Sequence, residues 1–231
     1  MFATAGFEEP GCAAATIFTV EQPPYLLNNW RTLQAQGDDI PQYSYVKYVR
    51  SLGGVLTITN GVSMIRYATG APDGFYIIDA AGRFVGVNPE KDNYYQIKIP
   101  DPESIKPEFP VMDRTGMIPR AEIAKFVEFL NYIRQSNNMI GEKVNVVLVD
   151  DVAVKDRSYM DKNGVMPEFA FPFRMPFKEG LRFDANALRI VFTEMLRYEE
   201  VQLLYDNLSH KRTPLVVGRG WGNCGLIMPR I

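Results

Sequence analysis

Hydrophobic positions near the end of the chain follow first helical and then strand spacing. Behind Asp184, a residue suited to cap a helix N-terminus, apolar side chains recur at i, i+3, i+4, i+7 and i+8, namely Leu188, Val191, Phe192, Met195 and Leu196. From Val201 the period falls to two, and strand-like runs at 213–218 and 224–231 flank a glycine-rich turn. The pattern predicts an amphipathic helix and then three adjoining strands, the last of which reaches the final residue.

The preceding segment repeats this order of helix and strands. A helix is predicted at 120–135, with an apolar face of Ile123, Phe126, Val127, Leu130 and Ile133. The β-branched run at 143–151 is typical of a strand buried on both faces, and the run at 152–158 alternates. Pro172 restricts the run at 167–173 to an edge strand, because proline has no amide donor.

The first half has a shorter version of the same plan. A strand is indicated at 15–20 and a short helix at 24–36. Strand-like runs follow at 43–50, 54–60, 62–69, 75–79, 83–87 and 94–100, and Asn60-Gly61 is a strong hairpin signal. No second helix is expected between Gly82 and Tyr94.

Five prolines between Pro100 and Pro119 exclude a central strand or a helix interior there. We interpret this segment as an extended linker, at about 100–119. The expected domains are therefore 1–110 and 111–231.

Composition limits the function classes. The 231 residues carry a net charge of −2, with a pI near 5.6, which argues against a globally basic nucleic-acid-binding surface. No apolar run is long enough for a membrane span, so no membrane association is expected. The two cysteines, Cys12 and Cys224, form no disulfide framework, which fits a reducing cytoplasm.

No motif indicates catalysis, a metal or a cofactor. The glycine-rich stretch 218–225 lacks the Lys-Ser/Thr of a phosphate-binding loop and does not open a helix, so we interpret it as a hairpin turn. The doublets Asp38-Asp39 and Asp150-Asp151 have no nearby histidine and are interpreted as turn residues. His210 is the only histidine. We therefore predict a protein that is not an enzyme and has no cofactor and no metal site.

An aromatic cluster lies at 166–183 and comprises Phe169, Phe171, Phe173, Phe177 and Phe183 with Met166 and Met175. Aromatic side chains can stack on bases, but a domain core or a covered edge strand is the commoner arrangement. We therefore favour a structural role for this cluster.

The segments "LRFDANALRIVFTEMLRYEEVQLLYDN…PLVV…GLIMPRI" and "IPQYSYVKYVRSLGGVLTITNGVSMIRYATG" resemble the last and first domains of bacterial-type DNA polymerase sliding clamps. The resemblance implies an α+β fold of two clamp-like domains, the first shortened, with antiparallel sheets backed by amphipathic helices. It also implies a processivity factor that encircles duplex DNA without sequence specificity and tethers a DNA polymerase or other clamp-binding proteins. A ring of six domains would need three chains, a homotrimer.

The resemblance also implies two sets of site residues. The terminal strand would contribute to a hydrophobic pocket for clamp-binding peptides through Ile227, Met228, Pro229, Arg230 and Ile231. The family usually has another apolar residue between the proline and the arginine, which is absent here. The helices would face DNA through Arg31, Arg120, Lys125, Arg134, Arg189 and Arg197.

Simpler readings of both sets stay open. The terminal residues also suit an ordinary strand packed on its sheet, and the cations suit solvated helix faces with pairs such as Glu122 and Lys125. The alternative function is a two-domain structural or adaptor protein that binds other proteins through a sheet edge.

Overall fold

The chain divides into two compact units, Met1–Ser104 and Ile105–Ile231. A computed structural model describes residues 17–19, 49–59, 63–79, 81–87, 117–139, 146–149, 153–156, 167–170, 181–204 and 214–229. The expected helix at 24–36, the strand at 94–100 and the Asn60-Gly61 turn lie outside these residues, as does most of the proline-rich segment.

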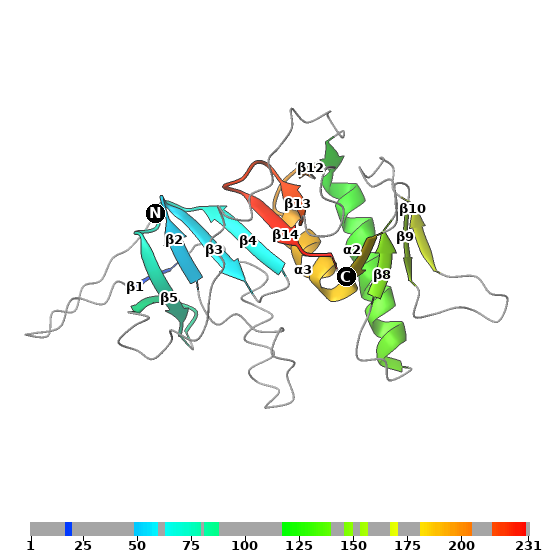
Figure 1. The fold of residues 1–231 in the computed structure, drawn as a ribbon, viewed down its shortest axis with the longest axis horizontal. Helices are drawn as coiled ribbons and strands as arrows, with labels where there is room; N and C mark the ends of the chain where they lie inside the picture. Colours follow the sequence, from blue (N-terminus) through cyan, green and yellow to red (C-terminus); the bar gives the residue numbers. More distant parts are fainter. Residues whose placement is uncertain are drawn as a thin grey trace, which may run out of the picture. The chain divides into compact units, whose positions relative to one another are not determined.

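Unit 1 contains an antiparallel sheet whose strands follow the order β1-β6-β5-β2-β3-β4 (Figure 1). Its strands are β1 (Ile17–Phe18), β2 (Val49–Leu52), β3 (Val55–Thr59), β4 (Ser63–Ala68), β5 (Gly74–Ile78) and β6 (Phe84–Val87). The runs of alternating residues at 54–60, 62–69, 75–79 and 83–87 are thereby confirmed as strands.

Aromatic stacking attaches β1 to strands that are distant from it in sequence. The ring of Phe18 lies parallel to that of Phe84 and edge-on to that of Tyr76, with centroids 4.8 Å apart in both pairs. The Tyr76 hydroxyl donates a hydrogen bond to the carbonyl oxygen of Pro72 at 2.7 Å. Burial, and secondarily the charge of Asp73, raises the pKa of Tyr76. These buried rings form the core of the sheet.

A tight turn joins β5 to β6. The Asp79 carboxylate accepts hydrogen bonds from the backbone N–H of Arg83 at 2.9 Å and from its Nε at 2.7 Å. The first of these bonds is the main cause that lowers the pKa of Asp79. Backbone hydrogen bonds from Asp79 N to Arg83 O at 3.0 Å and from Gly82 N to Asp79 O at 2.8 Å close the turn. The described residues between these strands therefore contain no helix.

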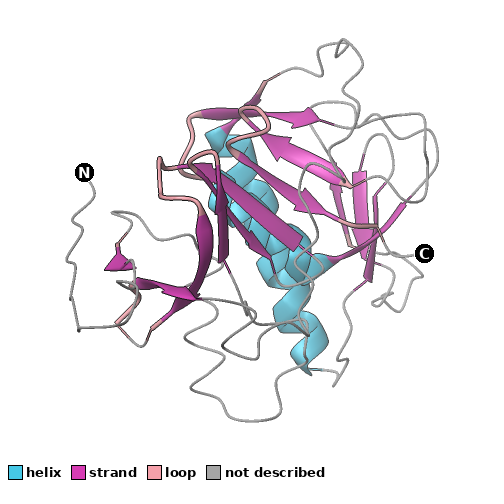
Figure 2. Cartoon of the chain, turned by 60° about the vertical axis from the view of Figure 1, so that its left-hand side comes forward, coloured by secondary structure: helices cyan, strands magenta, loops and turns pink. Residues whose placement is uncertain are grey.

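Unit 2 consists of two antiparallel sheets and two helices that pack against each other (Figure 2). Its elements are β7 (Ile118–Pro119), α2 (Arg120–Met139), β8 (Val146–Val149), β9 (Ala153–Asp156), β10 (Glu168–Ala170), β11 (Leu181–Asp184), α3 (Ala185–Met195), β12 (Glu200–Leu204), β13 (Leu215–Gly218) and β14 (Cys224–Ile227). Both predicted helices are present, and the predicted strands occur between and after them in the predicted order, but β7 and β11 are additional strands.

The unit repeats one motif, a strand, a helix and three strands, and the two copies exchange their first strands. The sheet β10-β9-β8-β11 is completed by β11 of the second copy. The strands β14-β13-β12 are likewise joined by β7 of the first copy. Because each half completes the sheet of the other, the two helices are held side by side over a shared core.

Several expectations for unit 2 need correction. The proline-rich segment does not remain an unpaired linker to Pro119, because Ile118–Pro119 pair with β12 at the sheet margin, where a proline needs no amide donor. The run at 143–151 is not buried on both faces, since Val146 and Leu148 are half-exposed. Strand β11 was not foreseen, and the last described strand ends at Ile227.

The two units share a sheet topology. In unit 1 the order β4-β3-β2-β5 matches the order β10-β9-β8-β11 in unit 2, and every neighbouring pair is antiparallel. The two units differ in the segment that follows these four strands. Strand β11 leads into helix α3, whereas β5 leads into the Asp79–Arg83 turn. Unit 1 is therefore a variant of unit 2 in which a turn stands where the second helix begins.

The α3 cap provides a test of the local fold. The Asp184 carboxylate accepts hydrogen bonds from the backbone N–H groups of Asn186 at 2.9 Å and Ala187 at 3.1 Å, as the sequence predicted. We expect Asp184→Ala to lower the free energy of unfolding by about 1 kcal/mol in urea titrations, because these donors lose their acceptor. Asp184→Asn keeps an acceptor oxygen, so it should lower the free energy of unfolding by only a few tenths of a kcal/mol. Equal effects of the two substitutions would contradict a capping role.

Candidate functional site

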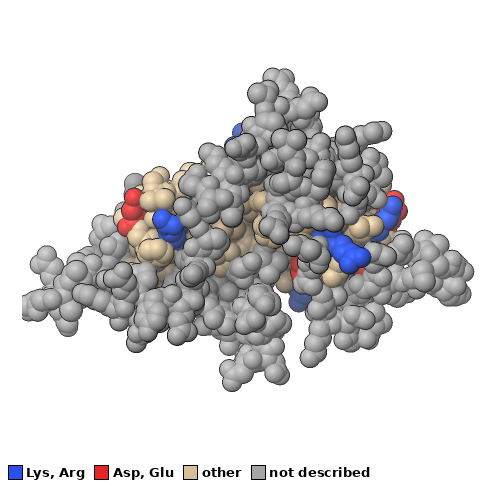
Figure 3. Space-filling view, in the orientation of Figure 1, with Lys and Arg blue, Asp and Glu red and all other residues tan. Residues whose placement is uncertain are grey.

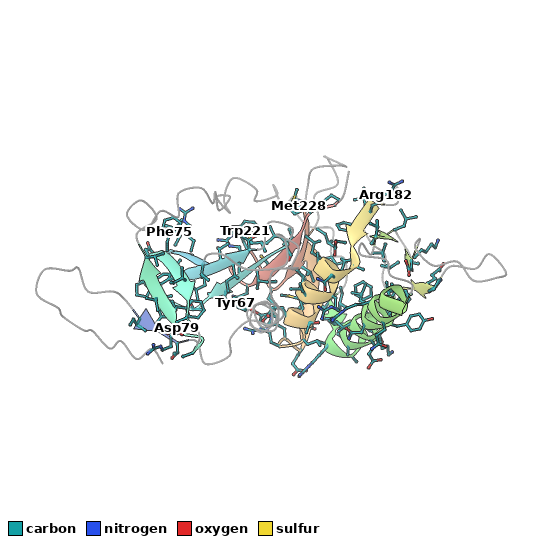
Figure 4. The ribbon with its side chains drawn as sticks, turned by 90° about the horizontal axis from the view of Figure 1, so that it is seen from below. Tyr67, Phe75, Asp79, Arg182, Trp221 and Met228 are labelled. Atoms are coloured by element: carbon teal, nitrogen blue, oxygen red, sulfur yellow. The ribbon has the colours of Figure 1, made fainter. Side chains whose placement is uncertain are left out.

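The C-terminal hairpin presents two different surfaces at its two ends. Strands β13 and β14 pair from Leu215 with Ile227 to Gly218 with Cys224, and the tip spans residues 219–223. The tip is closed by backbone hydrogen bonds from Arg219 N to Asn223 O at 2.9 Å and from Asn223 N to Gly220 O at 3.0 Å. This geometry confirms the hairpin interpretation of the glycine-rich stretch. Figure 4 shows Trp221 and Met228 at opposite ends of the hairpin.

The proposed pocket residues differ in accessibility. Ile227 is fully buried opposite Leu215, because it belongs to the sheet core. Met228, the residue after the strand, is 37% exposed, and Pro229 is buried behind it. Arg230 and Ile231 lie outside the described residues. Among the described members of the set, Met228 is therefore the side chain that a partner can reach, and Ile227 and Pro229 support it.

The cations expected to face DNA do not form one surface. Arg31 lies outside the described residues, whereas Arg120, Lys125 and Arg134 are exposed on α2. Figure 3 shows the described basic and acidic side chains in small separate groups on the face in view. A nine-residue separation is about two and a half helical turns, so Lys125 and Arg134 lie on opposite sides of α2. Arg120 and Lys125, five residues apart, are separated by about 140° around the axis.

The expected solvent exposure of Arg189 is wrong. Its side chain is 4% exposed, and its Nε and Nη2 donate to the Asn186 side-chain oxygen at 3.2 and 2.8 Å. Helix α3 contacts α2 on one side and strands β11, β13 and β14 on others, so little of its circumference reaches solvent. Arg189 is therefore a structural residue of the core.

Arg197 also forms an ion pair with a buried residue. It follows the end of α3, its side chain is 23% exposed, and Nη2 lies 2.5 Å from Oε1 of Glu194, whose side chain is 1% exposed. Removing the arginine would leave a buried carboxylate without this partner, which is costly. The ion pair gives Arg197 a structural role, and its expected contact with DNA stays a prediction.

Exposed ion pairs engage two of the α2 cations only weakly. Lys125 Nζ lies 2.8 Å from Glu122, and Arg120 Nη1 lies 3.4 Å from Glu199. Surface pairs of this type contribute about 0–1 kcal/mol, so neither prevents a cation from contacting another anion. Arg134 has no ion pair with any described residue.

The described aromatic residues of the 166–183 cluster belong to the core. Phe183 is fully buried, and the ring of Phe169 packs 5.2 Å from Phe126 and 5.6 Å from Phe129. This packing supports the structural interpretation for these two residues. Phe171, Phe173, Phe177, Met166 and Met175 lie outside the described residues.

The described part of the chain contains no group of three or more potential metal ligands. Asp38-Asp39, Asp150-Asp151 and His210 lie outside it. No helix among the described residues is both long and apolar enough to cross a membrane. Sequence reasoning overlooked one exposed aromatic side chain, Tyr132 on α2, which is 51% exposed.

Comparison with known proteins identifies the fold. No protein-family model matches the sequence. No curated protein matches it either. Solved structures do match it over nearly all of its length. They include a DNA polymerase sliding clamp from Pseudomonas aeruginosa with ligand (TM-score 0.53, 13% identity, 100% of this chain and 77% of that one). The DNA polymerase III subunit beta from the same organism also matches (TM-score 0.53, 15% identity, 97% of this chain and 68% of that one). A third match is the DNA polymerase sliding clamp from Caulobacter crescentus (TM-score 0.55, 10% identity, 97% of this chain and 67% of that one).

At these identities the likeness establishes the fold alone. The chain has the sliding-clamp fold, so the expectation of an α+β protein with clamp-like domains is confirmed. It spans 77%, 68% and 67% of these three clamp chains.

Proposed function

We propose that this chain is a DNA sliding clamp, a processivity factor whose copies enclose duplex DNA and tether a polymerase. The observation that supports this proposal most directly is the match of the entire chain to a bacterial sliding clamp with a TM-score of 0.53. Such a protein performs no chemistry. Its cytoplasmic location would follow from its work on the replicating chromosome or a phage genome.

The charge distribution is compatible with a topological rather than an electrostatic link to DNA. The net charge is −2, and the exposed cations of α2 point in different directions. A protein held on DNA by phosphate contacts needs several cations on one surface, and its affinity falls steeply with salt. An enclosing ring needs few such contacts, because escape requires that the ring open.

Ring closure would require several copies. Two clamp-like units per chain and a six-unit ring give a head-to-tail trimer with threefold symmetry. The four-strand order that the two units have in common supports this arithmetic. The α2 cations Arg120, Lys125 and Arg134 would then be the candidates for the inner wall.

The proposed peptide-binding surface is centred on Met228. A flexible, polarizable side chain at the end of a strand can adapt to an apolar anchor of a partner. Ile227 and Pro229 would hold it in place, and Arg230 and Ile231 would complete the surface. The partners would be a DNA polymerase and other proteins with a short clamp-binding peptide.

The ring proposal is tested by retention on DNA. After incubation at high protein concentration with nicked circular DNA, the protein should co-elute with the DNA on gel filtration. Linearising the DNA should release it, because a ring slides off free ends. Light scattering should report a trimer at the concentrations used. A monomer at all concentrations, with equal retention on circular and linear DNA, would refute the ring.

The peptide surface has a matched control within unit 2. We expect Met228→Ala to weaken binding of a polymerase-derived clamp-binding peptide about tenfold, the effect of losing one anchor residue. Met117 has nearly the same exposure, 38% against 37%, but a different location in the chain. Met117→Ala should leave the affinity unchanged. Fluorescence anisotropy of a labelled peptide measures the affinity of each variant. An equal loss of affinity in Met228→Ala and Met117→Ala would exclude a pocket at Met228.

The alternative, an adaptor that binds proteins through a sheet margin, is favoured by β10. Among the described residues this strand has a neighbour on one side only, and Glu168 and Ala170 are exposed. An adaptor would assemble independently of DNA and would not bind clamp-binding peptides. The DNA-retention and peptide-binding experiments therefore distinguish an adaptor from a clamp.

A further inference from the structure

Arg182 on β11 is an exposed cation whose neighbours follow from the strand register. The next residue, Phe183, is fully buried, so the alternation of side chains along a strand directs Arg182 to the opposite, solvent-facing side of the sheet. Directly opposite Arg182 on β8 lies Leu148, which is half-exposed, and the residue opposite Leu148 on β9 is Lys155. A leucine on this face is therefore flanked by two cations in one cross-strand row.

The two cations of this row differ in their partners. Lys155 Nζ lies 3.7 Å from the carboxylate of Glu168 on β10. Arg182 forms no ion pair or hydrogen bond with any described residue. Asp184 lies two residues further along the same face of β11, but its carboxylate accepts the two hydrogen bonds that cap α3. The charge of Arg182 is therefore the one in this row that a partner can use.

Arg182 lies near the end of the C-terminal hairpin that carries Met228. Figure 4 shows both side chains on the same side of unit 2, and in Figure 1, too, β14 ends beside β11, the strand that leads into α3. Helix α3 accounts for this arrangement, because it begins directly after β11 and packs against β14. Since an extended peptide advances about 3.3 Å per residue, a partner segment of a few residues that covers Met228 also reaches Arg182.

Building on the proposed peptide-binding function, we propose that Arg182 selects partner peptides that carry an acidic residue near their apolar anchor. The anchor packs on Met228, and a carboxylate of the same peptide pairs with the guanidinium of Arg182 beside Leu148. The whole chain has a net charge of −2, so it does not attract acidic peptides in general, and the positive charge of this row acts locally. Charge complementarity of this kind determines which partner is accepted more than how tightly it binds.

The test uses a fluorescent polymerase-derived clamp-binding peptide, extended at its N-terminal or C-terminal end by two aspartates, with two serines as the control for length. At one of the two ends, the aspartate form should bind the wild-type protein about threefold to fivefold more tightly than the serine form, the effect of an exposed ion pair. Arg182→Gln should abolish this preference and leave the affinity for the serine form unchanged. Arg182→Glu should reverse it, so that an extension of two lysines binds more tightly than two serines.

Arg219→Gln is the matched control. Arg219 is exposed in the hairpin tip, at the end opposite Met228, so its substitution removes one positive charge from unit 2 without altering the proposed surface. This variant should keep the preference for aspartate. An equal loss of preference in Arg219→Gln and Arg182→Gln would reveal attraction by overall charge and would overturn the inference. Equal weakening of the serine and aspartate forms by Arg182→Gln would also overturn it, because Arg182 would then have a structural role.

The outcomes separate this inference from the function on which it rests. If the wild-type protein binds the serine forms, loses affinity in Met228→Ala and has no preference for aspartate at either end, selection by Arg182 is refuted and the peptide-binding function stands. If the wild-type protein binds none of these peptides, both the inference and the peptide-binding part of the proposed function fail.

Discussion

Phe192→Ala is expected to lower the free energy of unfolding by about 3–5 kcal/mol, the range for removal of a buried aromatic side chain. Phe192 is 1% exposed on α3, and its ring meets that of Phe126 edge-on, with centroids 4.8 Å apart. The contact joins the two helices of unit 2. Because one helix belongs to each copy of the repeated motif, its loss leaves a cavity where the two copies meet.

Urea denaturation followed by far-ultraviolet circular dichroism measures this effect. Tyr132→Ala is the control, since it removes an aromatic ring from an exposed position of α2 and should change stability by no more than about 0.5 kcal/mol. A loss below about 1 kcal/mol for Phe192→Ala would show that the interface between the helices does not depend on this ring.

Gly218→Ala is expected to destabilise the protein by about 3 kcal/mol, the upper part of the range for an overpacked site. A Cβ at this position would lie 2.3 Å from the carbonyl oxygen of Asn223 and 2.6 Å from the Cα of Cys224. Both are backbone atoms of the hairpin, so the crowding cannot be relieved by rotation of a side chain. The hairpin would have to open at the hydrogen bond between Arg219 and Asn223.

The appropriate comparison is Gly53→Ala in the β2–β3 turn. Gly53 has φ 58°, and a Cβ there would meet no atom within 4 Å. Gly53→Ala should therefore lower the free energy of unfolding only by the energy of placing alanine in the left-handed backbone conformation, about 1–2 kcal/mol. Thermal unfolding of both variants, with the hairpin monitored by amide hydrogen exchange, tests the difference. A cost for Gly218→Ala equal to or below that for Gly53→Ala would contradict the steric argument.

The local periodicity of the chain was sufficient to predict most elements of unit 2. The five apolar residues of the 120–135 pattern are the most deeply buried of the described side chains of α2, and Asp184 caps α3 as expected. The hairpin between β13 and β14 also follows from the glycine-rich turn between two strand-like runs. These features depend on contacts between residues close in sequence, which is why spacing alone reveals them.

The candidate site was less predictable. Basic residues on predicted helices were taken as solvent-facing, but Arg189 is buried because α3 is packed on several sides. The angular separation of Lys125 and Arg134 follows from helix geometry, yet only the packing of α2 shows which side is open. Tyr132 was overlooked because an aromatic residue on an amphipathic helix is ordinarily assigned to the core.

The amino-acid sequence by itself determined where the helices and most strands of unit 2 lie, where α3 begins and that the runs of β13 and β14 form a hairpin, because these depend on short-range periodicity and capping. Tertiary structure alone decided that β7 and β11 are exchanged between the two copies of the motif, and that Arg189 and Ile227 are buried. It also decided that Lys125, Tyr132 and Met228 remain accessible. Accessibility depends on which distant segments cover a side chain, and no local pattern contains that information.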